Sequence, residues 1–195
     1  MEKKKLKIGI DLDDTILNWF EDFILFCKEN FGYELKKERF IYFKEEDFGS
    51  NENFTKALEE YVLQGKNWEM EFFIDFLDVF DELSSLFEIY FITARISDNK
   101  IKTKEFLKNK IGDNFELLYK NDFENLRKSD ICLNKNISIM VEDDAGHALG
   151  CAKSGIRCFL LDKPWNQNCE HENIIRVKDW NEILEKIMEV ENGIY

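Results

Sequence analysis

The sequence is poor in basic residues relative to acidic ones. Its 195 residues carry 27 lysine and arginine side chains against 40 aspartate and glutamate side chains, which gives a formal net charge of −13. This excess of negative charge disfavours binding to nucleic-acid polymers and to anionic membrane surfaces, because both recruit clustered basic side chains. We therefore expect the partner of this chain to be neither a nucleic-acid polymer nor a membrane.

Long hydrophobic runs and paired cysteines are also missing. The apolar run that begins at Ile8 is interrupted at Asp11, whereas the core of a signal peptide needs about 7–15 apolar residues. No stretch approaches the roughly 20 apolar residues of a membrane span. The five cysteines are scattered, and none are in Cys-x-x-Cys spacing, which disfavours a zinc site and a disulfide framework. These absences predict a cytoplasmic protein with reduced thiols.

Short β-branched or aromatic runs recur along the chain, and most are followed by a segment with helical spacing. The runs lie at 7–12, 88–93, 116–119, 137–141, 157–161 and 174–177, and the helical segments at 97–110, 145–154 and 180–191. Strands of this kind are typical of a buried parallel sheet. The alternation predicts βαβ units and an α/β fold.

The interval between the first two predicted strands breaks this alternation. It contains helical patterns at 16–31, 51–64 and 71–87, and residues 21–82 hold 17 acidic and 7 basic side chains. A single crossover helix needs only about a dozen residues. The interval therefore predicts a small helical cap inserted after the first strand. We expect an α/β core over 1–17 and 84–195, and the cap over 18–83.

Clustered carboxylates follow two of the predicted strands. The first cluster is Asp11, Asp13 and Asp14, and the second is Glu142, Asp143 and Asp144. One cluster alone is explained equally well by helix capping. Two clusters meet at the same edge of a parallel sheet, where like charges are costly unless a cation compensates them. Oxygen ligands favour a hard divalent ion, so the pattern predicts Mg²⁺.

The order of these residues resembles the haloacid dehalogenase-like phosphohydrolases. Their first motif, an apolar strand followed by Asp-x-Asp-x-Thr, is matched by residues 8–15. Thr93 matches the second motif, Lys128 the third, and the pair Asp143 and Asp144 the fourth. The resemblance implies a three-layer, Rossmann-like parallel sheet core with a cap. The segments 91–95 and 141–144 also resemble the 5'(3')-deoxyribonucleotidases and their bacterial nucleotidase relatives.

This resemblance implies a role for each matched residue. Asp11 would be the nucleophile that forms an aspartyl-phosphate, and Asp13 the acid and base. Mg²⁺ would be held by Asp11, the backbone carbonyl of Asp13, and Asp143. Thr93, Ala94 and Lys128 would bind the phosphoryl oxygens. Further residues expected around the site or near the substrate are Thr15, Asn18, Trp19, Phe43, Arg95 and Asp144.

Several residues admit a second interpretation. Asp14 is expected to cap a helix that begins near Thr15. Arg95 would contact either a substrate phosphate or a carboxylate of the cap. Lys120 and Lys135 compete with Lys128 for the phosphate. His147 and His171 are expected to be structural or exposed. Trp165 would edge the active site or, as the favoured interpretation, anchor a loop.

The sequence therefore predicts a Mg²⁺-dependent phosphomonoesterase whose substrate is a small phosphorylated metabolite. The nucleotidase resemblance favours nucleoside monophosphates, and the alternative is a phosphatase for a sugar or other small phosphate. A third hypothesis is a non-catalytic, receiver-like domain that binds phosphate. Receiver domains are shorter and lack a long insertion after the first strand, so order and length disfavour it. The oligomeric state is left open.

Overall fold

The computed structural model describes residues 5–35, 45–95, 99–122 and 126–191, and its centre is a six-stranded sheet. The strand order is β3-β2-β1-β4-β5-β6, and every neighbouring pair is parallel. The strands are β1 (Lys7–Ile10), β2 (Glu88–Thr93), β3 (Glu116–Tyr119), β4 (Ile139–Glu142), β5 (Arg157–Leu161) and β6 (Ile174–Val177). The expected parallel α/β core is confirmed.

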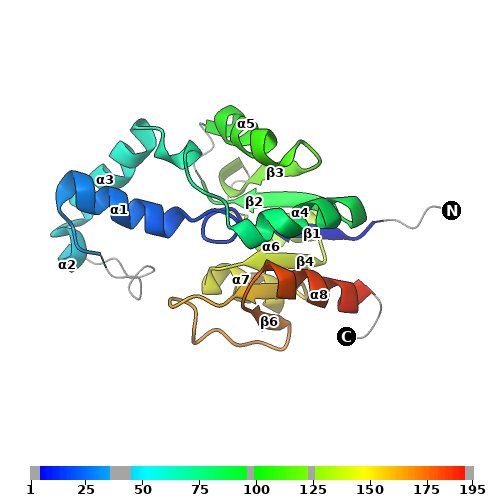
Figure 1. Ribbon diagram of the computed structural model, residues 1–195. Coiled ribbons are helices and arrows are strands. Elements are labelled where there is room, and N and C mark those ends of the chain that lie inside the picture. The colour runs from blue at the N-terminus through cyan, green and yellow to red at the C-terminus, as the bar shows by residue number, and fades with distance from the viewer. Residues whose placement is uncertain (1–4, 36–44, 96–98, 123–125, 192–195) are drawn as a thin grey trace.

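Helices cover both faces of this sheet, so the core has three layers (Figure 1). One buried cluster joins β1 and β2 to α4 and α8, and a second joins β4 and β5 to α6 and α7. The helices of the core are α4 (Ile74–Leu86), α5 (Lys100–Ile111), α6 (Lys128–Lys135), α7 (Ala145–Lys153) and α8 (Trp180–Glu191), and a 3-10 turn, η4 (Lys120–Asp122), follows β3. No helix among the described residues has the length and apolarity that crossing a membrane requires.

The two central strands, β1 and β4, pack closely against each other at Gly9. A Cβ atom on Gly9 would lie 2.6 Å from Sδ of Met140, nearer than two such atoms pack. Glycine therefore lets the two central strands and their packed side chains approach each other. Because β1 and β4 are neighbours, the loops that follow them open at the same end of the sheet.

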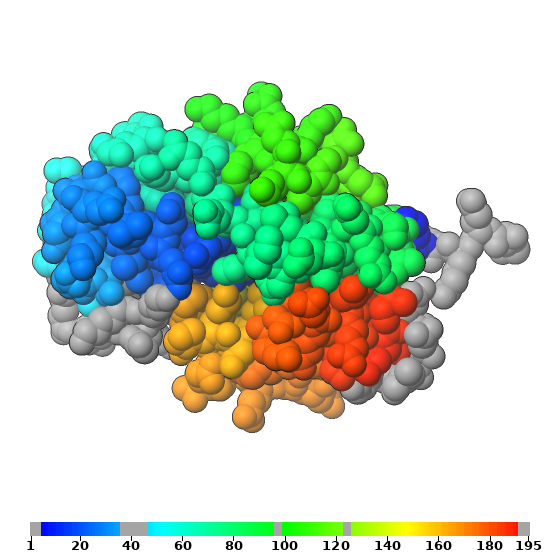
Figure 2. Space-filling view, in the orientation of Figure 1, coloured from blue at the N-terminus to red at the C-terminus, as the bar shows by residue number. Residues whose placement is uncertain are grey.

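A helical cap lies beyond that end of the sheet, on the side away from the start of β1 and the end of α8 (Figure 1). Its elements are α1 (Trp19–Phe31), α2 (Glu45–Phe48), α3 (Asn51–Leu63) and η2 (Lys66–Trp68). Phe23, Phe26, Phe48 and Tyr61 form a buried aromatic cluster of its own, separate from the core clusters. In the space-filling view this part forms a lobe beside the core (Figure 2). The expected helical insertion after the first strand is confirmed.

The chain enters and leaves the cap through two adjacent segments. Leu17 forms an antiparallel bridge with Phe72, and the N–H of Asn18 donates to the carbonyl of Glu71 over 2.9 Å. The helix expected from residue 16 begins only at Trp19, because the N–H groups of the preceding turn bond back to Leu12. The cap bounds 18–83 stay a prediction. We propose that the cap ends before α4, since α4 packs in the core cluster.

Candidate active site

The two acidic clusters meet where β1 and β4 end. The N–H of Asp11 donates to the carbonyl of Val141 over 3.0 Å, which holds the end of β1 beside the end of β4. Carboxylate oxygens of Asp11, Glu142 and Asp143 all lie within 4.8 Å of one another, and all three residues are buried. The juxtaposition expected from parallel strand ends is therefore present.

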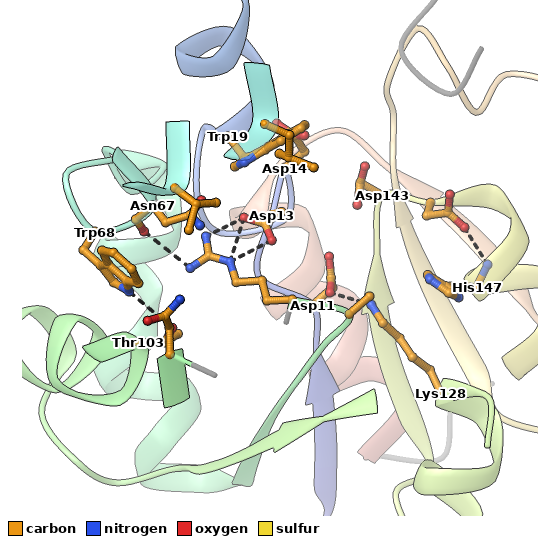
Figure 3. A pocket seen from close by; sticks show the side chains of 16 residues that line it. Asp11, Asp13, Asp14, Trp19, Asn67, Trp68, Thr103, Lys128, Asp143 and His147 are labelled. Atoms are coloured by element: carbon orange, nitrogen blue, oxygen red, sulfur yellow. Dashed lines mark hydrogen bonds and ion pairs between the residues drawn. The ribbon is translucent and has the colours of Figure 1, made fainter. Parts of the chain in front are cut away.

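A cavity of about 510 Å³ opens above these acids, between the core and the cap (Figure 3). Eight of the residues expected at the site line it: Asp11, Asp13, Trp19, Ala94, Arg95, Lys128, Asp143 and Asp144. Figure 3 shows Asp13, Asn67 and Trp68 on one side of this cavity and Lys128 and His147 on the other. Residues from both parts of the chain thus face one cavity.

Lys128 begins α6, and its side chain reaches Asp11. Its Nζ donates to Asp11 and, over 2.8 Å, to Oε1 of Glu142. Burial alone would lower the pKa of Lys128, but the charges of Asp11 and Glu142 outweigh it and raise that pKa above its usual value. Of the competing lysines, Lys135 pairs with Glu116, 2.6 Å away.

The three grouped carboxylates carry more negative charge than one lysine compensates. Burial, together with the charge of Asp11, raises the pKa of Asp143 to about 7. Burial also raises the pKa of Asp11 against the opposing effect of Lys128. Oε2 of Glu142 is buried without a hydrogen-bond partner among the described residues. An all-oxygen donor set with an unsatisfied atom fits a hard divalent cation.

Asp143 is held in place from two sides. Thr15 donates its hydroxyl to Oδ1 over 3.3 Å, and the Trp165 indole donates to Oδ2 over 2.9 Å. Asn166 donates to the backbone carbonyl of Asp143 over 2.7 Å. Trp165 therefore contacts the site directly, which is the less favoured of its two interpretations from the sequence. The Asn166 contact was not predicted.

Asp13 is paired with Arg95 at the wall of the cavity. Nε of Arg95 donates to Oδ2 of Asp13 over 2.9 Å, and Nη2 donates to Oδ1 over 2.5 Å. The backbone N–H of Arg95 donates to the hydroxyl of Thr93 over 3.1 Å. Thr93 is buried at the end of β2 and is not among the residues that line the cavity, so its expected contact with phosphate stays a prediction. The partner of Arg95 is thus a carboxylate of the core, and not one of the cap as the second interpretation supposed.

Asp14 lies beside the site and takes a structural role. Its φ of 56° is left-handed, a conformation that aspartate tolerates better than most residues. Oδ1 accepts from the N–H of Phe20 over 2.9 Å, in the first turn of α1. Asp14 therefore caps a helix as expected, although that helix begins at Trp19 and not near Thr15.

Three other residues that the sequence analysis expected around the site differ in where they lie. Asp144 lines the cavity and also caps α7, because its Oδ1 accepts from the N–H of His147 over 2.7 Å. Asn18 donates its amide to Glu21 over 3.2 Å and does not line the cavity. Phe43 lies outside the described residues.

Glu142 and His147 are further residues of this region to which the sequence analysis assigned no catalytic or binding role. Glu142 belongs to the acidic group at the strand ends. Its position directly after a predicted strand is the feature of the sequence that could have identified it. His147 lines the cavity instead of being only structural or exposed. Burial and the charge of Lys128 lower the pKa of His147 to about 4, so its imidazole is neutral near pH 7.

The cap contributes a largely apolar wall opposite the acids. It consists of Trp19 from α1, Leu58 and Val62 from α3, and Trp68 from η2. Trp19 stacks on Phe23 with ring centroids 4.9 Å apart. Nε1 of Trp68 donates to the hydroxyl of Thr103 on α5 over 3.3 Å. Two indole rings are therefore fixed at the cavity.

Comparison with known proteins gives relatives in sequence and in structure. No protein-family model matches the chain. A nucleotidase of Clostridium acetobutylicum is 27% identical over 184 residues, which cover 92% of each chain. A Bacillus subtilis protein named "Putative nucleotidase YqfW" is 28% identical over 196 residues, again 92% of each chain.

Solved structures share the fold at lower identity. A haloacid dehalogenase-like hydrolase of Streptococcus pneumoniae superimposes with a TM-score of 0.67 at 19% identity, covering 94% of this chain and 98% of the other. A haloacid dehalogenase-like protein of Agrobacterium tumefaciens gives a TM-score of 0.68 at 13% identity, covering 96% of this chain and 100% of the other. Both the expected fold and the expected nucleotidase resemblance are confirmed.

Proposed function

We propose that this chain, which has the haloacid dehalogenase-like fold and resembles nucleotidases in sequence, is a Mg²⁺-dependent phosphomonoesterase for nucleoside monophosphates. The observation that carries the proposal is the arrangement at the strand ends. Asp11 accepts a hydrogen bond from buried Lys128 and lies within 4.8 Å of Glu142 and Asp143. Asp13 faces the same cavity.

The acidic group would hold the metal. We propose Asp11, the backbone carbonyl of Asp13, and Asp143 as ligands, with Glu142 beside them in the same group. When bound, Mg²⁺ would neutralise charge on the phosphoryl oxygens. Trp165 and Thr15 would keep the Asp143 carboxylate oriented through their hydrogen bonds to it.

The reaction would proceed in two displacements at phosphorus. The Asp11 carboxylate forms a bond to phosphorus as the ester bond breaks, and Asp13 gives its proton to the leaving oxygen. Water then attacks phosphorus, the bond to Asp11 breaks, and Asp13 takes the proton of the water. Thr93, Ala94 and Lys128 would bind the phosphoryl oxygens, as charge-stabilising donors do.

The cavity supports a nucleoside as the leaving group. Its volume of about 510 Å³ lies in the usual range for small-molecule sites. Its cap side presents Trp19 and Trp68, and stacking on an aromatic ring is worth about 1–3 kcal/mol per base. A sugar phosphate offers no such planar face. We also propose a cytoplasmic location, which is supported by the five buried cysteines all being free thiols.

A phosphatase assay tests this proposal. Phosphate release is measured over nucleoside monophosphates and sugar phosphates, with Mg²⁺ and with a chelator. We expect activity on nucleotides that requires Mg²⁺ and is lost in Asp11→Asn. Asp81→Asn changes an exposed carboxylate on α4 and should retain full activity.

Three results would change the conclusion. A preference of tenfold or more for sugar phosphates would establish the alternative substrate class. Activity that persists in Asp11→Asn would exclude the aspartyl-phosphate route. Absence of hydrolysis for every ester with Mg²⁺ present would leave the non-catalytic phosphate-binding domain, which direct phosphate titration would then reveal.

A further inference from the structure

Arg95 contacts three separate parts of the molecule. Its backbone N–H donates to Thr93 at the end of β2, and its guanidinium holds both carboxylate oxygens of Asp13. Nη1 donates to the backbone carbonyl of Asn67 in η2 over 3.4 Å, and Nη2 lies 4.0 Å from Sδ of Met70. The side chain is only 9% exposed. One arginine therefore joins two loops of the core to the cap.

The geometry of the guanidinium restricts Asp13. Nε and Nη2 approach different oxygens of the carboxylate, which is the two-point fork that fixes the plane of a carboxylate. The third nitrogen, Nη1, donates to the backbone carbonyl of Asn67 in the cap. The direction of the Asp13 carboxylate is therefore set by a side chain whose own position depends on η2.

The η2 turn is docked on the core by a second set of contacts. Trp68, the residue after Asn67, donates its indole N–H to Thr103 on α5. Nζ of Lys102 lies 4.8 Å from the centroid of the Trp68 ring, within the range of a cation–π contact. These contacts hold the Asn67 carbonyl where Arg95 reaches it.

We infer that Arg95 is a positioning residue that couples docking of η2 to the placement of the Asp13 carboxylate. This inference rests on the proposed function, in which Asp13 transfers protons. Docking of the cap on the core and alignment of the Asp13 carboxylate then occur together. A substrate enclosed by a docked cap meets an aligned Asp13, whereas an undocked cap removes the Asn67 contact that fixes the Arg95 guanidinium and, through it, the direction of the Asp13 carboxylate.

The contacts also indicate which half of the reaction depends most on Arg95. Both oxygens of Asp13 accept N–H donors from Arg95, so the contact is an ion pair with the carboxylate, the form in which Asp13 meets the attacking water. Asp13 receives a proton when water attacks the phosphoryl group, the oxygen–phosphorus bond to Asp11 breaks, and the water proton passes to Asp13. We expect loss of Arg95 to slow this hydrolysis more than the first displacement.

Rapid-mixing kinetics with p-nitrophenyl phosphate and a nucleotide test the catalytic part. We expect Arg95→Gln to lower kcat by about 100-fold, the order of loss for a misplaced group, with KM little changed. A burst of p-nitrophenol should appear, and kcat should become equal for the two esters because they share one slow hydrolysis. Thr103→Val, which removes the acceptor for Trp68, should give a smaller effect of the same kind.

Hydrogen–deuterium exchange of the substrate-free protein tests the docking part without activity. Exchange over residues 66–71 should be faster in Arg95→Gln and in Thr103→Val than in the wild type. Arg157→Gln is the matched control, because Arg157 lies at the start of β5, at the sheet end opposite the cavity. This variant should match the wild type in both exchange and kinetics.

Two outcomes overturn the inference. If Arg95→Gln raises KM and the inhibition constant of inorganic phosphate without a burst, Arg95 is a phosphate ligand instead. If exchange over 66–71 is unchanged, Arg95 does not hold η2. A wild type inactive on both esters overturns the proposed function and the catalytic part with it, whereas the exchange result still decides the docking part.

Discussion

Lys128 Nζ lies 2.8 Å from Oε1 of Glu142, and the two side chains are 2% and 0% exposed. The same nitrogen bonds Asp11, so a single cation serves two buried carboxylates. Asp143 completes a group that carries a net negative charge when all three acids are ionised. Lys128 compensates only part of the negative charge of these three carboxylates. The group can therefore accept one further cation.

Replacing Lys128 should destabilise the fold. Lys128→Met leaves Asp11 and Glu142 buried without their cation, and removing one partner of a buried pair costs about 3–5 kcal/mol. Urea denaturation with a chelator present measures the free energy of unfolding. The control is Lys135→Met, which removes an exposed pair with Glu116 worth about 0–1 kcal/mol. Equal stabilities of the two variants would contradict the compensating role of Lys128.

Mg²⁺ should stabilise the protein against heat. Binding to the folded state adds about 2.7 kcal/mol when the ion is at 100 times its dissociation constant, so Tm should rise with Mg²⁺ concentration. Asp143→Asn removes one of the proposed ligands and should abolish this rise in Tm. Asp162→Asn, an exposed acid after β5, should keep it. A persistent Mg²⁺ effect in Asp143→Asn would place the ion elsewhere.

Trp19→Ala should raise KM for nucleotides selectively. Losing a stacking partner costs about 1–3 kcal/mol, which corresponds to about 5–150-fold in KM. A simple alkyl phosphate has no ring to stack, so its KM should stay the same. Leu63→Ala, at an 80% exposed cap position, is the control. An equal rise in KM for the nucleotide and for the alkyl phosphate would mean that Trp19 maintains the structure of the cap and does not recognise the base.

His147 should make the free energy of unfolding depend on pH. The pKa of His147 is lowered from 6.5 to about 4 in the folded protein, so the unfolded chain binds more protons between these values. Its stabilising contribution is therefore complete above pH 6.5 and falls as the pH drops towards 4, by about 2 kcal/mol at pH 5. Urea denaturation at pH 7 and pH 5 measures the free energy of unfolding at each pH. The difference between the two values should be smaller in His147→Gln than in the wild type. An unchanged difference would mean that another group titrates.

The strands and most of the helices follow from the sequence because their signals are local. The runs at 88–93 and 157–161 coincide with β2 and β5, since apolar β-branched and aromatic stretches favour a buried strand wherever they occur. The start of α1 was misplaced by three residues. Its position depends on a turn that bonds back to Leu12 and on the Asp14 side chain, which periodicity does not report.

The sequence by itself determined the parallel core, the cap insertion and the acids at two strand ends. These follow from the order of residues and from the rule that parallel strands end at one edge. Only the tertiary structure decided that Arg95 pairs with Asp13, that Trp165 orients Asp143, and which lysine reaches Asp11. Each of these contacts joins residues 22 to 117 positions apart. Their partners are chosen by how the loops and the cap pack, and no local pattern encodes that choice.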